Sequence, residues 1–261
     1  MLSTASIGSP ASTGPGSRAL YLGHGGRKRV SCTDTALVVT NANAQTHRYP
    51  VARLSRVVSS PLVDWSGAAL ALCMRSGIGI TWIDSHGDSL GSLYPLRRGN
   101  VSFATALELL VETAQGLARY QDWLRSRRMA VLIQWTRTSD SEITPHEWEA
   151  TKREWVYAAR IAEHLPRALR GHSQAWVAAQ LSLHHMPPVL WGPEGQGIDL
   201  DDDLTELLWG EMNLCTGGLA DTTFTERELT SLFERWISSN GSALLLHLHS
   251  LQRLAMKELA T

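Results

Sequence analysis

The sequence predicts an α+β fold in which a small β-rich domain is followed by an all-helical lobe. Short apolar and β-branched runs, separated by turn residues, fill residues 19–95. After Pro95 the sequence pattern changes, and apolar residues recur every three or four positions. A Ser/Gly/Pro-rich stretch precedes both parts. We therefore expect a disordered arm over 1–18, a β-rich dimerisation domain over 19–95 and a helical lobe over 96–261.

The β-rich part combines strands with one short helix. Turn residues such as Gly25-Gly26 predict hairpins between successive strands. A helix capped by Asp64 or Ser66 and ended by Gly77 follows. The next strand is apolar on both faces, which predicts a helix on one side and a sheet or second subunit on the other. The expected strands cover 19–23, 27–33, 36–41, 45–51, 54–60, 79–84 and 89–93.

The helical part begins with one long amphipathic pattern. Helical spacing continues over 101–135 and predicts a single helix. The pair Thr144 and Glu147 has the spacing of a capping box and predicts the start of a second helix, which extends to about Arg160. Further helices are predicted over 165–183, 200–214, 225–238 and 242–259.

Composition narrows the class of protein. The net charge is −1, yet residues 1–95, 96–170 and 171–261 carry +4, +3 and −8. A basic front and an acidic tail suit contact with a polyanion and with a basic partner or cation, although charge alone favours ordinary solvated faces. No apolar run is long enough for a membrane span, and the three cysteines lack metal-ligand spacing. We expect a cytoplasmic protein with no membrane contact.

Several ordered segments carry a resemblance to a known family. The runs LYLG, RVSCTDTALVV, YPVARLSRVV and GAALALCMRSGIGITWIDSHGDSLGSLYP resemble, in this order, the β-domain of the CRISPR adaptation integrases. That family consists of metal-dependent nuclease-integrases that insert new spacers into CRISPR arrays. The resemblance covers about residues 19–98. It implies a homodimer through the β-domain, a helical lobe that binds double-stranded DNA, and Mg²⁺ or Mn²⁺ as cofactor in an active member.

The metal-ligand positions of that family depart from its pattern. ALRGHSQAWVAAQL resembles the family's Leu-Arg-Gly-x-Glu-Gly helix, which places Ser173 where the ligand glutamate is expected and Gln174 at the following glycine. A hydroxyl lacks the charge with which a carboxylate holds a hard cation. The family's histidine corresponds to His247 or His249, and its aspartate to Leu254. No ligand is matched, and the weak catalytic candidates are Glu154, His247 and Glu258.

Each candidate also has a plain structural explanation. His247 and His249 fall on different faces of a leucine-rich helix, which favours packing over chelation. Glu154 suits a solvated helix surface. The acidic run 199–203 precedes an apolar helix and favours capping, with a site for a basic partner or cation as the alternative. The recurring tryptophans favour core packing over base stacking.

A cluster of arginines gives the strongest indication of DNA contact. Integrases hold a duplex through its phosphates, and basic residues gather at the domain junction and along the first long helix. The leading hypothesis is a subunit that binds and positions prespacer or repeat DNA, with weak or lost nuclease activity, beside a small adaptation partner protein or a catalytic paralogue. The alternatives are an active integrase with unaligned ligands and a scaffold without a nucleic-acid role. The proposed DNA-binding residues are Arg97, Arg98, Arg125, Arg127 and Arg128.

Overall fold

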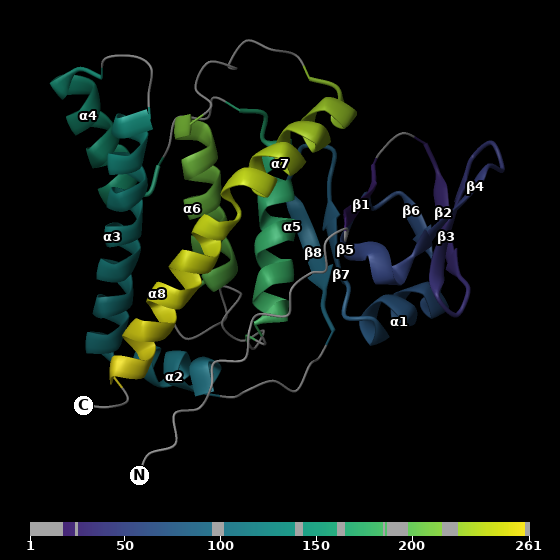
Figure 1. Ribbon diagram of the computed structural model, residues 1–261, viewed down its shortest axis with the longest axis horizontal. Helices are drawn as coiled ribbons and strands as arrows, with labels where there is room; N and C mark the ends of the chain where they lie inside the picture. Colours follow the sequence, from purple (N-terminus) through teal and green to yellow (C-terminus); the bar gives the residue numbers. More distant parts are fainter. Residues whose placement is uncertain are drawn as a thin grey trace.

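The chain folds as a β-rich part followed by helices, and this confirms the predicted α+β fold (Figure 1). The computed structural model describes residues 18–23, 26–95, 102–138, 143–160, 165–184, 186, 198–215 and 224–258. The arm predicted over 1–18 lies outside these residues, apart from Arg18, which begins the first strand. None of the described helices is long and apolar enough to cross a membrane.

In the described part of the chain, eight strands form two four-stranded sheets, ordered β1-β5-β7-β8 and β4-β3-β2-β6. Antiparallel pairing joins β2 to β3 and β3 to β4, as predicted for hairpins. However, β1 pairs in parallel with β5 and lies in a different sheet from β2, so the hairpin predicted between these two strands does not form. Local turn residues could not reveal this pairing because the partner strand lies over 30 residues away. The strands are β1 Arg18–Leu22, β2 Lys28–Cys32, β3 Ala36–Asn41, β4 Thr46–Pro50, β5 Leu54–Ser59, β6 Val63–Trp65, β7 Gly79–Ile83 and β8 Ser89–Leu93, with a short 3₁₀ turn η1 at Val51–Arg53.

The short helix of the β-domain is α1, Gly67–Arg75. Ser66 is its N-cap, because the Ser66 side chain accepts a hydrogen bond from the Ala69 amide. Gly77 follows the helix at φ +75°, as the predicted stop requires. The side chains of α1 pack into a core with both sheets. The second face of β7 packs against α5 of the same chain. The sequence predicts a sheet or a second subunit on this face, but the helical lobe covers it instead.

The long helix predicted over 101–135 is two helices, α2 (Ser102–Val111) and α3 (Ala114–Thr138). The Gly116 amide donates a hydrogen bond to Thr113 Oγ1 at 2.9 Å, as at the start of a new helix. A Cβ on Gly116 would lie 1.7 Å from the Leu110 carbonyl oxygen. The apolar spacing continues across the bend, and therefore the break was missed.

The remaining helices agree broadly with prediction. Thr144 and Glu147 form the expected capping box at the start of α4, and the helix continues as a π-helical segment, η2. Trp123 and Trp155 are buried in the lobe's core, as expected for the tryptophans. The helices are α4 Pro145–Thr151, η2 Lys152–Tyr157, α5 Ala168–Leu183, α6 Leu200–Cys215, α7 Glu226–Asn240 and α8 Ser242–Glu258.

Candidate functional site

Helix α5 lies at the centre of the molecule and contains the position of the expected metal ligand. One side of α5 packs against β5, β7 and β8, and other sides pack against α6 and α7 (Figure 1). The two domains therefore meet on this helix. Its neighbours decide what each of its side chains can do.

The face of α5 toward the β-domain is packed at backbone distance. A Cβ on Gly171 would lie 2.3 Å from the Gly87 carbonyl oxygen. A Cβ on Gly87 would lie 2.2 Å from the Cα of Ala168, and Gly87 has φ +91°. Both positions therefore require glycine. The turn between β7 and β8 thus lies directly on the start of α5.

A polar cluster joins the β-domain to α7 beside this contact. The buried Arg56 of β5 forms an ion pair with Glu234 of α7. Tyr21 Oη donates to the same carboxylate at 2.6 Å and accepts a hydrogen bond from Arg56 at 3.1 Å. Burial raises the pKa of Tyr21, so the phenol stays protonated. The cluster pairs the Arg56 guanidinium through Nη2, and this buried arginine of the basic front does not form part of the surface.

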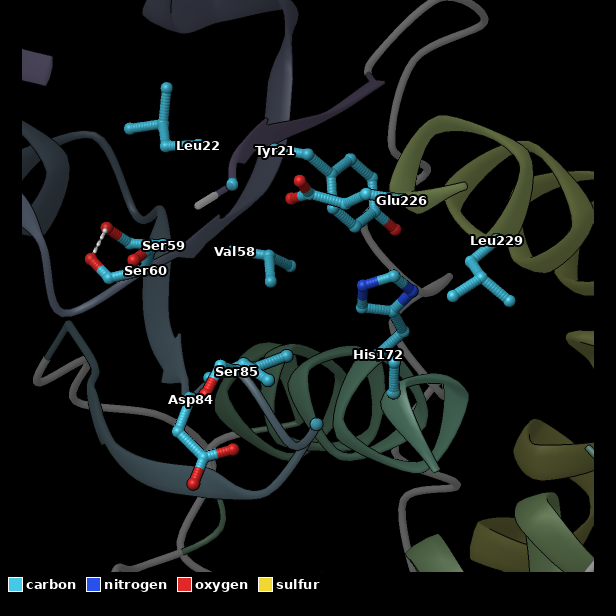
Figure 2. A pocket seen from close by; sticks show the side chains of 14 residues that line it. Tyr21, Leu22, Val58, Ser59, Ser60, Asp84, Ser85, His172, Glu226 and Leu229 are labelled. Atoms are coloured by element: carbon cyan, nitrogen blue, oxygen red, sulfur yellow. Dashed lines mark hydrogen bonds between the residues drawn. The ribbon is translucent and has the colours of Figure 1, made fainter. Parts of the chain in front are cut away.

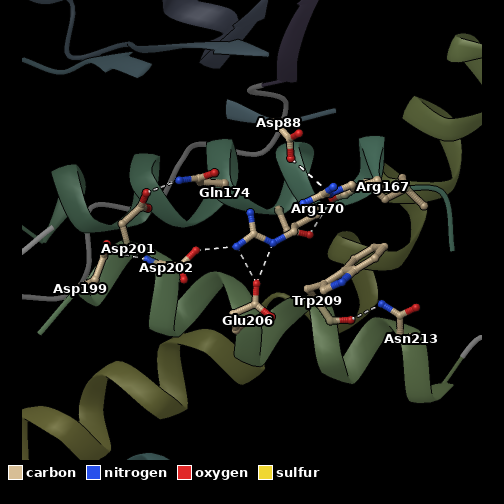
Figure 3. Close-up of polar contacts among 12 residues, drawn as sticks. Asp88, Arg167, Arg170, Gln174, Asp199, Asp201, Asp202, Glu206, Trp209 and Asn213 are labelled. Atoms are coloured by element: carbon tan, nitrogen blue, oxygen red, sulfur yellow. Dashed lines mark hydrogen bonds and ion pairs between the residues drawn. The ribbon is translucent and has the colours of Figure 1, made fainter. Parts of the chain in front are cut away.

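The face of α5 toward α6 carries a network of paired charges (Figure 3). Arg170 Nη2 lies 2.5 Å from Asp202 Oδ1 and 2.6 Å from Glu206 Oε1. Gln174 Nε2 donates to Asp201 Oδ2 at 2.8 Å. Two aspartates of the acidic run predicted for capping or cation binding, Asp201 and Asp202, thus pair with α5 of their own chain.

Burial raises the pKa of aspartates in this run, and two of them accept hydrogen bonds from groups outside α5. Burial raises the pKa of Asp201 to about 7 and that of Asp203 to about 6. Asp203 accepts a hydrogen bond from Tyr120 Oη at 2.8 Å. Asp199 accepts one from the Asp202 amide at 3.0 Å, which is the capping role predicted.

Ser173, at the expected glutamate position, faces the protein interior. It has no exposed surface, and its hydroxyl donates to the Leu169 carbonyl oxygen at 2.9 Å. This bond to the preceding helical turn is a common arrangement for a serine within a helix. The hydroxyl is therefore engaged in local helix structure.

The three weak catalytic candidates lie on two elements, η2 and α8. Glu154 on η2 is half exposed and lies 3.6 Å from Arg153 Nε. His247 on α8 is buried, and burial, with a smaller contribution from Arg127, lowers its pKa to about 4. Glu258 is the last residue of α8, and its side chain lies outside the described set.

The arginines proposed for DNA binding have unequal exposure. Arg125 on α3 is half exposed and pairs with Asp122 at 2.8 Å. Arg127 is partly exposed and donates to Ser126 Oγ. Arg128 is only 7 % exposed, and its guanidinium lies 5.7 Å from the ring centre of Trp155. This packing leaves Arg128 little surface for a ligand. Arg97 and Arg98 lie outside the described residues.

Comparison with known families identifies the fold. A family model described as CRISPR associated protein Cas1 matches residues 21–170, which is more than half of the chain. The chain belongs to the Cas1 family. The resemblance to the CRISPR adaptation integrases is confirmed by this match.

Solved structures agree with the Cas1 assignment at the level of fold. A Cas1 protein from Thermotoga maritima has a TM-score of 0.68 at 11% identity, covering 92% of this chain and 97% of its own. TtCas1 in a complex with DNA has a TM-score of 0.60 at 15% identity, covering 91% of each chain. A casposase bound to integration product has a TM-score of 0.62 at 11% identity, covering 92% and 91%. A search of curated proteins found no match.

The residues that the structure describes do not form a site for the divalent metal that the Cas1 family implies. Ser173 supplies no charge and is bonded to its own helix. Within the described ranges, no three His, Cys, Asp or Glu side chains converge in a way that could hold a metal ion. The Cas1 family match also ends at residue 170, three positions before Ser173.

The sequence reasoning missed the structural roles of two residues on α5. Arg170 and Gly171 belong to the Leu-Arg-Gly motif that aligned this helix with the Cas1 family. Arg170 binds two carboxylates of α6, and Gly171 admits the β7–β8 turn. The motif itself was a usable signal, because a glycine within a helix often marks close approach of another backbone.

Proposed function

We propose that this Cas1-family chain binds and positions prespacer or repeat DNA within an adaptation complex, with weak or lost metal-dependent nuclease activity of its own. The observation that carries the proposal is Ser173, which aligns with the family's expected ligand glutamate and is fully buried and bonded to Leu169. Without a carboxylate there, the site lacks the negative charge that binds Mg²⁺ or Mn²⁺.

The DNA-holding part of the proposal rests on two arginines of α3 that reach the surface and on the retained fold. Arg125 and Arg127 lie within one turn of α3 and both have exposed surface. Such contacts hold a duplex by its phosphates, largely without regard to sequence. TtCas1 has been solved with DNA and a casposase with its integration product, and both share this fold.

The proposed assembly supplies what the chain lacks. A homodimer through the β-domain would place two helical lobes on one duplex. A small adaptation partner protein that bridges dimers, or a catalytic Cas1 paralogue, would complete the complex. The chemistry, and the Mg²⁺ or Mn²⁺ it needs, would then reside in the paralogue.

Strand integration separates this proposal from an active enzyme. The assay uses a short duplex with 3′-hydroxyl ends, a supercoiled repeat-bearing plasmid and Mn²⁺, with the chain alone and with co-encoded adaptation proteins. We expect no integration by the chain alone and integration in the mixture. Integration by the chain alone that is lost in Glu154→Ala or His247→Ala would instead establish an active integrase with ligands at unaligned positions.

Duplex binding tests the other half of the proposal. Affinity is expected to fall by about tenfold or more between low and moderate salt, because phosphate contacts release counterions. Arg125→Ala combined with Arg127→Ala is expected to weaken binding and reduce the salt slope by about two. Arg153→Ala is the matched control, since Arg153 is an exposed arginine on η2 outside the proposed surface. Salt-independent or undetectable binding would favour a scaffold without a nucleic-acid role.

A further inference from the structure

A pocket of about 270 Å³ lies between the β-domain and the helical lobe (Figure 2). One wall is formed by the carboxyl ends of β1, β5 and β7, which pair in parallel. The opposite wall is formed by the beginnings of α5 and α7. Carboxyl ends of neighbouring parallel strands are a common place for ligands. The pocket contains neither Ser173 nor any arginine proposed for DNA binding.

His172 supplies a polar atom that the protein leaves unused. The residue is 7 % exposed, and its Nδ1 has no hydrogen-bond partner among the described residues. Figure 2 shows the imidazole directed from α5 into the pocket. Burial and the nearby Arg56 lower its pKa to about 4, so the ring is neutral at neutral pH. Because buried polar atoms are nearly always paired, a ligand that hydrogen-bonds to this ring is expected.

The unpaired charge at the pocket is negative. The carboxylate of Glu226 lies against the backbone of Gly23, where a Cβ would be 1.4 Å from Oε1. No cation in the described part of the chain pairs with Glu226. Arg56 is nearby but is bound to Glu234 and Tyr21. Glu226 is therefore open to a cationic group.

Two features exclude an anionic ligand such as a DNA phosphate. Helix N-termini attract anions, but at α7 the Glu228 amide already donates to Thr225 Oγ1, and the carboxylate of Glu226 in the first turn repels an anion. The start of α5 is covered by the turn at Gly87. Asp84, the second carboxylate of the lining, accepts hydrogen bonds from the amides of its own turn and points away from the pocket (Figure 2).

We propose that this pocket binds an alkylguanidinium group, the chemistry of an arginine side chain. A planar guanidinium has five donors, enough for the Glu226 carboxylate and for His172 together. Its apolar stem would pack on Val58, Ile83 and Leu229 at the pocket wall. The volume suits a side chain rather than a larger ligand. Since both domains form the pocket, the occupant would hold them together.

Binding is tested on the full chain with small probes. Propylguanidine represents a free guanidine, N-acetylarginine methylamide represents an arginine within a protein, and propylurea is the neutral control of the same shape. Calorimetry is combined with NMR of the labelled imidazole of His172. Both guanidinium probes are expected to bind in the millimolar range, and propylurea at least about tenfold more weakly. Tighter binding of N-acetylarginine methylamide would indicate that the natural ligand is an arginine within a protein, and tighter binding of propylguanidine would indicate a free guanidine.

Variants assign the binding to the pocket. Glu226→Gln is expected to weaken both guanidinium probes by about tenfold, because a charged pair becomes a neutral one. Glu112→Gln, the same change on an exposed residue just after α2, should leave binding unchanged. His172→Phe preserves the ring and removes Nδ1, so it should also weaken binding; near-ultraviolet circular dichroism checks its fold. Equal binding of propylurea and propylguanidine, or no binding of either guanidinium probe, would overturn the proposal.

Discussion

Helix α5 holds its two neighbours by different physical means. Toward the β-domain it offers Gly171, which lets the Gly87 turn approach at backbone distance. Toward α6 it offers Arg170 and Gln174, which bind three carboxylate side chains. Close packing tolerates almost no added volume, whereas a charge network responds to pH. The contact of α5 with the β-domain therefore depends on close packing, and its contact with α6 depends on the protonation state of the aspartates.

The packed side is expected to give the largest effect. In Gly87→Ala the new Cβ would lie 2.2 Å from the Cα of Ala168, and φ +91° adds backbone strain. Gly26→Ala is the matched control, since Gly26 has φ +90° with no atom within 4 Å of a Cβ. We expect about 1 to 2 kcal/mol of destabilisation for Gly26→Ala and about 2 kcal/mol more for Gly87→Ala, measured by urea unfolding. Equal losses would mean that the turn moves away from α5 at no cost.

This contrast also explains what could be predicted from sequence. The helix over 67–75 and the capping box at Thr144 followed from local signals, and both are present. The parallel pairing of β1 with β5 and the break near Thr113 depend on contacts that no local pattern records. The alignment of Ser173 came from the Leu-Arg-Gly motif. The partners of Arg170 did not, because an acidic run reads the same whether it faces solvent or an arginine.

The charged side predicts a dependence of stability on pH. Burial raises the pKa of Asp201 from its unfolded value of 3.8 to about 7. Between these values the folded chain keeps a proton that the unfolded chain releases, so this contribution is full below about pH 4 and is lost as pH rises to about 7. Asp201→Asn cannot ionise, so it removes this loss of stability, and the oxygen of the asparagine side chain can still accept the hydrogen bond from Gln174. Relative to wild type, we expect it to gain on the order of 2 kcal/mol from pH 4 to pH 8.

The measurement is urea unfolding of both proteins across that pH range, reported as the difference between them. His172 and His247, whose pKa values are lowered to about 4, have the opposite slope, because the unfolded chain binds their protons first. Their contribution cancels in the difference. A pH-independent difference would mean that the network with Gln174 and Arg170 keeps Asp201 ionised throughout.

The smallest effect is expected at His172, the buried polar side chain of α5 that contacts Tyr21 of the β-domain. The rings of Tyr21 and Phe233 lie 5.0 Å and 5.8 Å from that of His172 in edge-on contacts, which a phenyl ring could keep. His172→Phe removes an unpaired buried nitrogen, so we expect a gain of about 1 kcal/mol in the free energy of unfolding.

His247→Phe is the matched comparison, because His247 is also buried and its Nδ1 is also without a described partner. Urea unfolding at pH 7.5 should show a similar gain in both variants, while only His172→Phe should lose guanidinium binding. A destabilised His172→Phe would mean that Nδ1 is hydrogen-bonded in solution, for example to water. A gain in stability together with a loss of binding would show that His172 lowers the stability of the chain but is needed for binding in the pocket.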